Sequence, residues 1–248
     1  MATRIRNGII LASLAIFFHP YELTAQNEPL KPAMKPVLAA SAGSADAGIL
    51  IDPGAAAWQS IEPKRIALNR TPRLYDTEPP SELEIPELEV RVARADDKVM
   101  VRLSWRDPTE DAAKIAAAPA APAEGRFRKE PTDATDRFFD AAAVMFPTGG
   151  KAGAAAPGLQ MGDVQDPVTI YYWNAGRGSM LMDAKGRETT RRTGQVFPAR
   201  AIHQAGSWSV CFELPDLPNG TPLAFAVWNG SQQDRDGRKY FSVWHWLE

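Results

Sequence analysis

Residues 87–105 read Glu-Leu-Glu-Val-Arg-Val-Ala-Arg-Ala-Asp-Asp-Lys-Val-Met-Val-Arg-Leu-Ser-Trp, and they alternate apolar residues with charged or small ones. Leu88, Val90 and Val92 keep this spacing before the polar turn at residues 95–97, and residues 99–105 resume it afterwards. Side chains two residues apart share one face of a β-strand. The stretch therefore predicts a β-hairpin with one buried face.

Further period-two runs follow along the chain, at residues 168–173, 208–212, 223–227 and 241–247. Residues 137–147 have the pattern of another strand, which enters the fold after a long loop. Proline and glycine mark the turns between the runs, and no strand alternates with a helical pattern. The pattern favours an all-β fold, an antiparallel sandwich or barrel with long loops.

Length and composition suit a single globular domain. The chain has 248 residues, of which 44% are hydrophobic and 23% are charged. Its formal net charge is -2, and no basic run of the kind that tracks phosphates is found. These features exclude nucleic acid and anionic lipid as expected partners.

The first 25 residues have the features of a cleaved secretory signal. Arg4 and Arg6 precede an apolar run at residues 9–18, and small residues lead to Ala25. The run is about half of the roughly 20 residues that a membrane-spanning helix needs, which argues against an anchor. The two arginines are not adjacent, so we expect general secretion to the periplasm, cleavage after Ala25 and no membrane span after cleavage.

Two segments are expected to lie apart from the sandwich. Residues 26–47 are rich in proline and alanine and have no apolar period, which is typical of a tether or an extended arm. The folded domain is expected over residues 48–248, interrupted by an Ala/Pro-rich insertion at residues 112–125 that is typical of disorder.

The chain carries few of the groups that enzyme chemistry requires. His203 and His245 are the only histidines beyond the signal, and no helical histidine pair, Gly-x-Ser-x-Gly elbow or phosphate-binding glycine loop is present. Cys211 is the single cysteine, which excludes an internal disulfide, a thiolate metal site and covalent haem attachment through Cys-x-x-Cys-His. We therefore expect no catalytic residues in this chain.

Two residues nevertheless stand out from this background. Met161 lies in a polar loop between glycines, where a methionine folded onto the end of the sandwich is the ordinary interpretation. Lys239 lies between a Gly-Arg turn and an aromatic strand, where a solvated hairpin lysine is the ordinary interpretation. The residues alone favour these interpretations.

Five stretches, in order along the chain, resemble the haem b (gamma) subunits of periplasmic molybdenum enzymes related to ethylbenzene dehydrogenase, dimethylsulfide dehydrogenase, selenate reductase and chlorate reductase. The stretches are Asp52-Pro53 with Trp58, residues 101–109, residues 139–147, Met161-Gly-Asp with residues 167–173, and residues 226–239. Together they span nearly all of the predicted domain.

The resemblance implies a fold, a cofactor and a site. It implies a β-sandwich with a few short helices that holds one haem b without covalent bonds, with Met161 and Lys239 as axial ligands of the iron. Trp228 and Asn229 fall in the matching stretch and are predicted to bind the cofactor. Two filled axial positions leave the iron no open site for substrate, so we expect a non-catalytic electron-transfer subunit of a molybdenum-dependent oxidoreductase.

The resemblance also implies partners. These are an iron-sulfur beta subunit and a molybdopterin alpha subunit in a heterotrimer, with a soluble periplasmic cytochrome as an external electron partner. Two alternatives stay open. One is an exported carbohydrate-binding module without haem, in which tryptophans stack on sugars, and the other is a stand-alone cytochrome with Met161 and a histidine as ligands.

Overall fold

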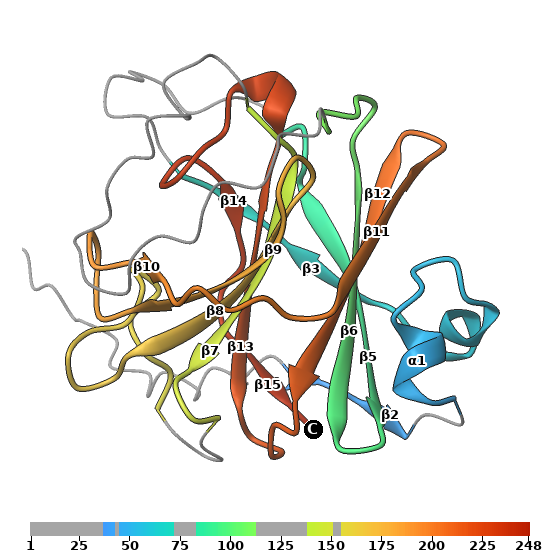
Figure 1. The fold of residues 1–248 in the computed structure, drawn as a ribbon, viewed down its shortest axis with the longest axis horizontal. Helices are drawn as coiled ribbons and strands as arrows, with labels where there is room; N and C mark the ends of the chain where they lie inside the picture. The colour runs from blue at the N-terminus through green and yellow to red at the C-terminus, as the bar shows by residue number, and fades with distance from the viewer. Residues whose placement is uncertain (1–36, 43–44, 72–82, 113–137, 151–154) are drawn as a thin grey trace, which may run out of the picture. The chain divides into compact units, whose positions relative to one another are not determined.

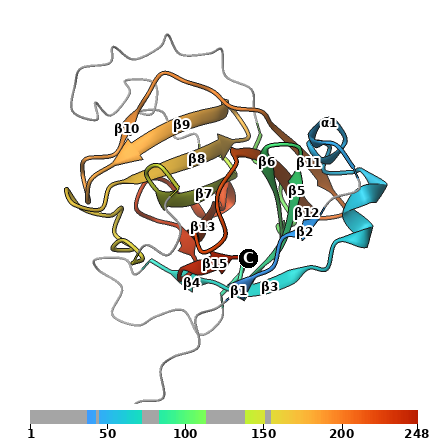
Figure 2. The ribbon, with the colours of Figure 1, turned by 90° about the horizontal axis from the view of Figure 1, so that it is seen from below.

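The computed structural model describes residues 37–42, 45–71, 83–112, 138–150 and 155–248. These residues form two β-sheets that pack face to face, with short helices and loops around them (Figures 1 and 2). The predicted all-β fold is confirmed, and its architecture is a mainly antiparallel sandwich. None of the helices in the described ranges has the length and hydropathy needed to cross a membrane.

The nine-stranded sheet has the order β1-β15-β13-β7-β8-β9-β10, with β14 beside β13 and β4 beside β14. Its strands are β1 (Val37–Leu38), β4 (Asn69–Arg70), β7 (Ala141–Pro147), β8 (Val168–Asn174), β9 (Gly178–Ala184), β10 (Arg191–Arg192), β13 (Pro222–Trp228), β14 (Tyr240–Phe241) and β15 (His245–Leu247).

The six-stranded sheet has the order β11-β12-β6-β5-β2, with β3 also paired to β5. Its strands are β2 (Ser41–Ala42), β3 (Lys64–Ala67), β5 (Glu87–Ala95), β6 (Lys98–Arg106), β11 (Ala199–Gln204) and β12 (Ser207–Pro215). The helical elements of the described chain are α1 (Ala47–Leu50) and the 3-10 turns η1 (Ala56–Ser60) and η3 (Gly230–Gln232).

The predicted hairpin is formed by β5 and β6. Ala95 pairs with Lys98 across the turn, and Asp96 adopts a positive φ of 54°, a conformation that aspartate tolerates in tight turns. Val90, Val101 and Leu103 are fully buried, as the alternation predicts. These side chains belong to the main core between the two sheets, to which the other sheet contributes residues such as Val144 and Phe225.

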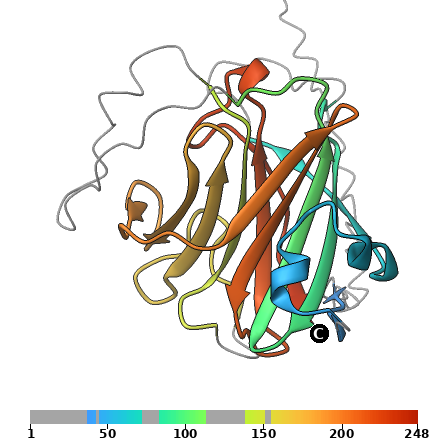
Figure 3. The ribbon, with the colours of Figure 1, turned by 45° about the vertical axis from the view of Figure 1, so that its right-hand side comes forward.

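Two further apolar clusters lie outside this main core. One covers the outer face of the nine-stranded sheet and is described below as the candidate site. The other lies on the outer face of the six-stranded sheet, where α1 and η1 pack over Met100 and Cys211 (Figure 3). Burial raises the pKa of the Cys211 thiol to about 12, as suits a packed and unreactive side chain.

The segment that precedes residue 48 contributes two short strands. β1 pairs in parallel with β15, and β2 pairs in parallel with β5. Each sheet is thereby extended by residues within the stretch predicted as an arm, and Asp46 caps α1 by accepting a hydrogen bond from the backbone of Ile49. The predicted signal at residues 1–25 and all of the Ala/Pro-rich insertion except Ala112 lie outside the described residues.

Asp140 ties the ends of the two sheets together. Its fully buried carboxylate accepts hydrogen bonds from the indole of Trp208 at 2.9 Å and from the backbone N–H groups of Asp111 at 2.7 Å and Gly230 at 2.9 Å. Burial raises the pKa of Asp140 to about 6, and the neighbouring Asp107 acts in the same direction. Gly230 begins the loop that leads to Lys239, so this contact fixes one end of that loop.

Candidate functional site

The outer face of the nine-stranded sheet is apolar, although no second sheet covers it. Strand register places Ala226, Ala143, Tyr172 and Met180 in one row across β13, β7, β8 and β9. The adjacent row is Ala224, Met145, Ile170 and Met182. Alanine rises little above the pleat, so the middle of this face is low, and methionines and aromatic rings border it. We call this surface the outer apolar face.

Met161 reaches the outer apolar face from the loop between β7 and β8. Its side chain is partly buried and packs against the cluster of that face. The backbone turns sharply here, because Met161 has a φ of 73° and Gly162 a φ of 65°. The carbonyl of Met161 accepts a hydrogen bond of 2.8 Å from Gly186 N–H, which fixes the loop to the turn after β9.

Gly162 is required at its position for a steric reason. A Cβ atom there would overlap the backbone oxygen of Asp166, and it would also lie 3.1 Å from Val168 Cγ1. The left-handed φ is in addition one that side chains rarely adopt. The Met-Gly pair therefore builds a tight turn that directs the methionine onto the sheet.

Lys239 lies at the other end of the outer apolar face. Its Nζ is 5.4 Å from the ring centroid of Trp228, a cation–π distance. Burial lowers the pKa of Lys239 from 10.5 to about 8; Arg187 acts in the same direction, and Asp236 opposes both. The interpretation of Lys239 as a solvated hairpin lysine is therefore wrong.

The backbone of Lys239 is held by residues from the N-terminal half of the chain. Its carbonyl accepts hydrogen bonds from Thr71 N–H at 3.0 Å and Thr71 Oγ1 at 3.1 Å. Beside it, Arg70 donates two hydrogen bonds of 2.5 Å to Asp234, whose side chain is fully buried. Arg238 lies 3.3 Å from the same carboxylate. This network fixes the loop between η3 and β14 and hence the origin of the Lys239 side chain.

Trp228 and Asn229 have different surroundings. Trp228 is 6% exposed, contacts Tyr172 edge to face at 5.2 Å, and donates its indole N–H to the carbonyl of Asp236 at 3.1 Å. The side-chain oxygen of Asn229 accepts a hydrogen bond from Gln232 N–H, as the cap of η3, and its amide nitrogen donates to Glu84 Oε2 at 3.4 Å. Trp228 thus lines the face beside Lys239, whereas Asn229 shapes the loop.

The C-terminal tryptophans close the remaining side of the outer apolar face. Trp244 is 6% exposed and donates its indole N–H to the carbonyl of Pro157 at 2.7 Å, which ties the C-terminus to the Met161 loop. Trp246 packs partly buried against the same cluster. Since the rings of Trp228 and Trp244 are buried, they offer no exposed face for a sugar to stack on.

The two histidines lie elsewhere. His203 is on β11 of the other sheet, where its Nε2 lies 2.8 Å from the carbonyl oxygen of Asp107. His245 is in register with Leu223, which faces the main core, and burial lowers its pKa. Among the described residues, no group of three or more His, Cys, Asp and Glu side chains is arranged to hold a metal ion.

Sequence reasoning missed several residues of this face. One is Tyr172, whose hydroxyl oxygen accepts a hydrogen bond of 3.2 Å from the Asn174 side-chain amide. Burial raises the pKa of Tyr172 to about 12, while the charges of Arg192 and Arg177 act to lower it. Met145, Met180 and Met182 were missed as well. The signal was available, because β7 and β13 are apolar at consecutive positions, which predicts strands buried on both faces.

The sequence that forms this sandwich can be compared with known families. The chain belongs to the ethylbenzene dehydrogenase family, whose model matches residues 55–212. The match includes Met161 and ends before Lys239.

Three relatives are each 29% identical to this chain. One is a Haloferax mediterranei protein named as a respiratory nitrate reductase heme subunit, aligned over 205 residues that cover 78% of this chain and 66% of the relative. The second is the chlorate reductase subunit gamma of Ideonella dechloratans, whose alignment covers 64% of this chain and 63% of the relative. The third is the dimethylsulfide dehydrogenase subunit gamma of Rhodovulum sulfidophilum, whose alignment covers 66% of this chain and 61% of the relative. The chain thus spans less than two thirds of the length of each of these relatives.

Proposed function

We propose that this chain is a non-catalytic electron-transfer subunit that binds one haem b, without covalent bonds, at the outer apolar face. Met161 and Lys239 are the proposed axial ligands of the haem iron. The observation that carries the proposal is a partly buried lysine whose pKa is lowered to about 8, beside an apolar face rich in methionine. The relative named as a heme subunit supports the choice of cofactor.

The residues of this face suit the proposed group. An amine binds a metal only when it is deprotonated, and the buried position of Lys239 favours the neutral form. A thioether is a soft ligand that suits ferrous iron, and Met161 is held at the face by its glycine turn. A bound haem would supply one-electron redox chemistry. Trp228 and Trp244 would exclude water from it, because both are buried in the same cluster.

We propose that three arginines at the edge of the outer apolar face, Arg177, Arg187 and Arg192, bind the two haem carboxylates. Arg192 on β10 is in register with Met182, so its side chain leaves the sheet on the side of the outer apolar face. Arg177 lies in the turn between β8 and β9. The charges of Arg177 and Arg192 both act to lower the pKa of Tyr172, which places them near this face. The charge of Arg187 likewise acts to lower the pKa of Lys239. Arginine pairs with carboxylates in a fork geometry, so these three side chains are the proposed propionate partners.

The proposal extends to cellular location and partners. Residues 1–25 are the proposed cleaved signal for export to the periplasm, and the part of the predicted arm that precedes β1 is the proposed docking element. The proposed assembly is a heterotrimer with an iron-sulfur beta subunit and a molybdopterin alpha subunit, and a soluble periplasmic cytochrome is the external electron partner. Two of the relatives are named as gamma subunits of a chlorate reductase and a dimethylsulfide dehydrogenase, which supports a multi-subunit enzyme.

Reconstitution with haem tests the ligands. The protein is titrated with haemin, and the visible spectrum of the reduced complex is compared among variants. Met161→Leu and Lys239→Leu are each expected to abolish the low-spin spectrum, whereas the matched controls Met182→Leu and Lys64→Leu keep it. Failure of the parent protein to bind haem would refute the proposed cofactor. Loss of the spectrum in His245→Ala, with Lys239→Leu unaffected, would favour the stand-alone cytochrome.

A further inference from the structure

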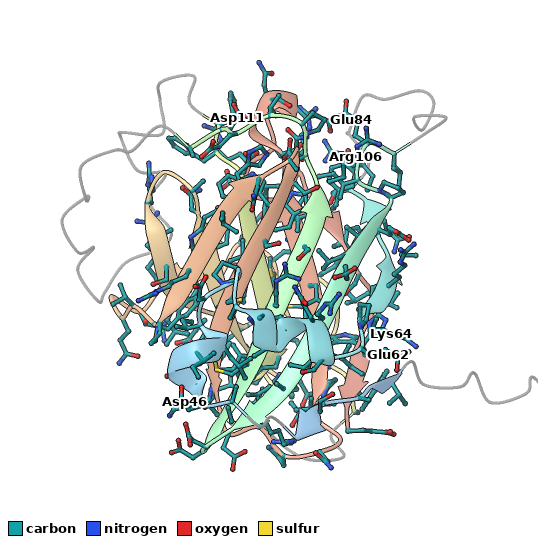
Figure 4. All side chains as sticks on the ribbon, turned by 90° about the vertical axis from the view of Figure 1, so that its right-hand side faces the viewer. Asp46, Glu62, Lys64, Glu84, Arg106 and Asp111 are labelled. Carbon is teal, nitrogen blue, oxygen red and sulfur yellow. The ribbon has the colours of Figure 1, made fainter. Side chains whose placement is uncertain are left out.

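A cavity of about 350 Å³ opens on the outer face of the six-stranded sheet. This is the opposite side of the sandwich from the outer apolar face, and Figure 4 views it directly, with α1 and η1 crossing the sheet. Its volume is at the lower end of the range of about 300–1,000 Å³ that is typical of small-molecule pockets. The lining includes Trp58, Arg91, Arg102, Ile202, Gln204 and Ser209.

Two arginines lie directly opposite each other in this cavity. Arg91 on β5 pairs with Arg102 on β6 in the strand register, so both side chains project from the same face of the sheet. Their side chains are only 17% and 18% exposed. Like charges at directly opposed positions destabilise a sheet. Burial lowers the pKa of Arg102, and the charge of Arg91 adds to this effect.

One carboxylate partly compensates these two charges. Glu89 lies 3.0 Å from Arg91 Nε and 3.8 Å from Arg102 Nη1. The lining that the structure describes holds these two guanidinium groups and no carboxylate, while Glu89 and Asp52 lie beside it. The positive charge of the lining favours a ligand that carries a negative charge.

Both guanidinium groups are held in fixed positions. Arg102 donates from Nε to the carbonyl of Pro53 at 3.0 Å and from Nη2 to Ser209 Oγ at 3.0 Å. Arg91 donates from Nη1 to the carbonyls of Trp58 and Ile61, each at 2.7 Å. Within the described ranges, these hydrogen bonds do not involve Nη2 of Arg91 or Nη1 of Arg102, and the latter has only its longer ion-pair contact of 3.8 Å with Glu89. Two preorganised donors from neighbouring arginines are suited to the two oxygens of a carboxylate.

We propose that this cavity binds a small organic monocarboxylate. Its carboxylate group lies between Arg91 and Arg102, and its apolar part lies toward Ile202, which is 39% exposed. The site is separate from the proposed haem site and does not depend on it, because it lies on the other sheet.

Calorimetric titration with benzoate tests the proposal, with benzyl alcohol as the neutral analogue at matched ionic strength. Benzoate is expected to bind with one-to-one stoichiometry, and benzyl alcohol is expected not to bind measurably. Arg102→Met is expected to weaken benzoate binding about tenfold or more, because it removes one charged donor. Arg200→Met is the matched control, since Arg200 is exposed on the same sheet and does not line the cavity.

Three results would overturn the proposal: no benzoate binding, equal binding of benzyl alcohol, or unchanged binding in Arg102→Met. Circular dichroism shows whether that variant folds, and Arg102→Lys replaces it if it does not. Lysine keeps the charge but loses the fork, so binding is expected to weaken there too, and unchanged binding in Arg102→Lys would also overturn the proposal.

Discussion

Replacing Lys239 with leucine is expected to stabilise the haem-free protein. The pKa of Lys239 is lowered from 10.5 to about 8, and each pKa unit corresponds to about 1.4 kcal/mol between the two protonation states. Holding the ammonium in its folded position therefore costs roughly 2–3 kcal/mol, after allowance for its partial exposure. Leucine keeps the apolar packing against Trp228 and removes this cost. At pH 7 the free energy of unfolding should accordingly rise by roughly that amount.

The gain should depend on pH in a defined window. Below about pH 8 the lysine is protonated in both the folded and the unfolded state, so the full cost is present. Between pH 8 and 10.5 the folded amine is neutral while the unfolded one still binds a proton, so the stability of the parent protein rises with pH. The difference between Lys239→Leu and the parent should therefore shrink across this window.

Urea unfolding of the haem-free proteins at pH 7, 8, 9 and 10 measures this difference. Lys64→Leu is the matched control, because Lys64 is an exposed lysine on β3 and no such window is expected for it. If Lys239→Leu unfolds more easily than the parent at pH 7, or if its gain is the same at every pH, the buried-amine reasoning fails.

The same amine predicts a pH dependence of haem binding. At pH 6 most molecules carry the ammonium, so binding of iron by Lys239 must release a proton. Haem affinity should rise by about tenfold per pH unit up to about pH 8 and then level off. Haemin titration at fixed ionic strength follows this rise. An affinity that is the same at pH 6 and pH 8 would argue for another ligand, while leaving the stability prediction untouched.

Three further variants test the parts that position the site. Arg70→Met leaves the buried carboxylate of Asp234 without its bidentate partner and should lower the free energy of unfolding by about 3 kcal/mol in urea; a loss below about 1 kcal/mol would contradict that account. Asp140→Ala removes the acceptor of three N–H groups and should cost about 3 kcal/mol or more by the same measurement, so an unchanged midpoint would sink the claim. Gly162→Ala should weaken haem binding in spectroscopic titration, because its Cβ would overlap the backbone oxygen of Asp166; haem affinity equal to that of the parent would refute the steric argument.

Local periodicity was sufficient to predict an all-β fold but left a sandwich and a barrel open, and the family resemblance implied the sandwich. The β5–β6 hairpin forms as the alternation indicates, because its register is set by a short turn and by one buried face. The short strands β1 and β2 were not predicted. Each is only two residues long, which is too short to show an alternating pattern. Each forms because it pairs in parallel with a strand that is distant in the sequence.

The burial of Lys239 could not be predicted from local sequence. Its loop is fixed by the pairing of Arg70 with Asp234, which are 164 positions apart in the chain. Thr71, from the same distant segment, holds the backbone of Lys239 itself. A hairpin lysine is ordinarily solvated, and only these long-range contacts bring this one over the ring of Trp228. Resemblance to a family identified the residue, and the fold explains why its environment is unusual.

The two outer faces of the sandwich differ in a way that periodicity alone does not require. The outer face of the six-stranded sheet carries the polar residues Glu89, Arg91, Arg102 and Ser104 at one end, and α1 and η1 cover its apolar residues at the other. The outer face of the nine-stranded sheet carries alanines and methionines instead, and loops and tryptophans cover it. Stability needs only one apolar face on each sheet, since the main core already lies between them. The outer apolar face, with a lysine of lowered pKa at its edge, therefore supports the haem site that we propose there.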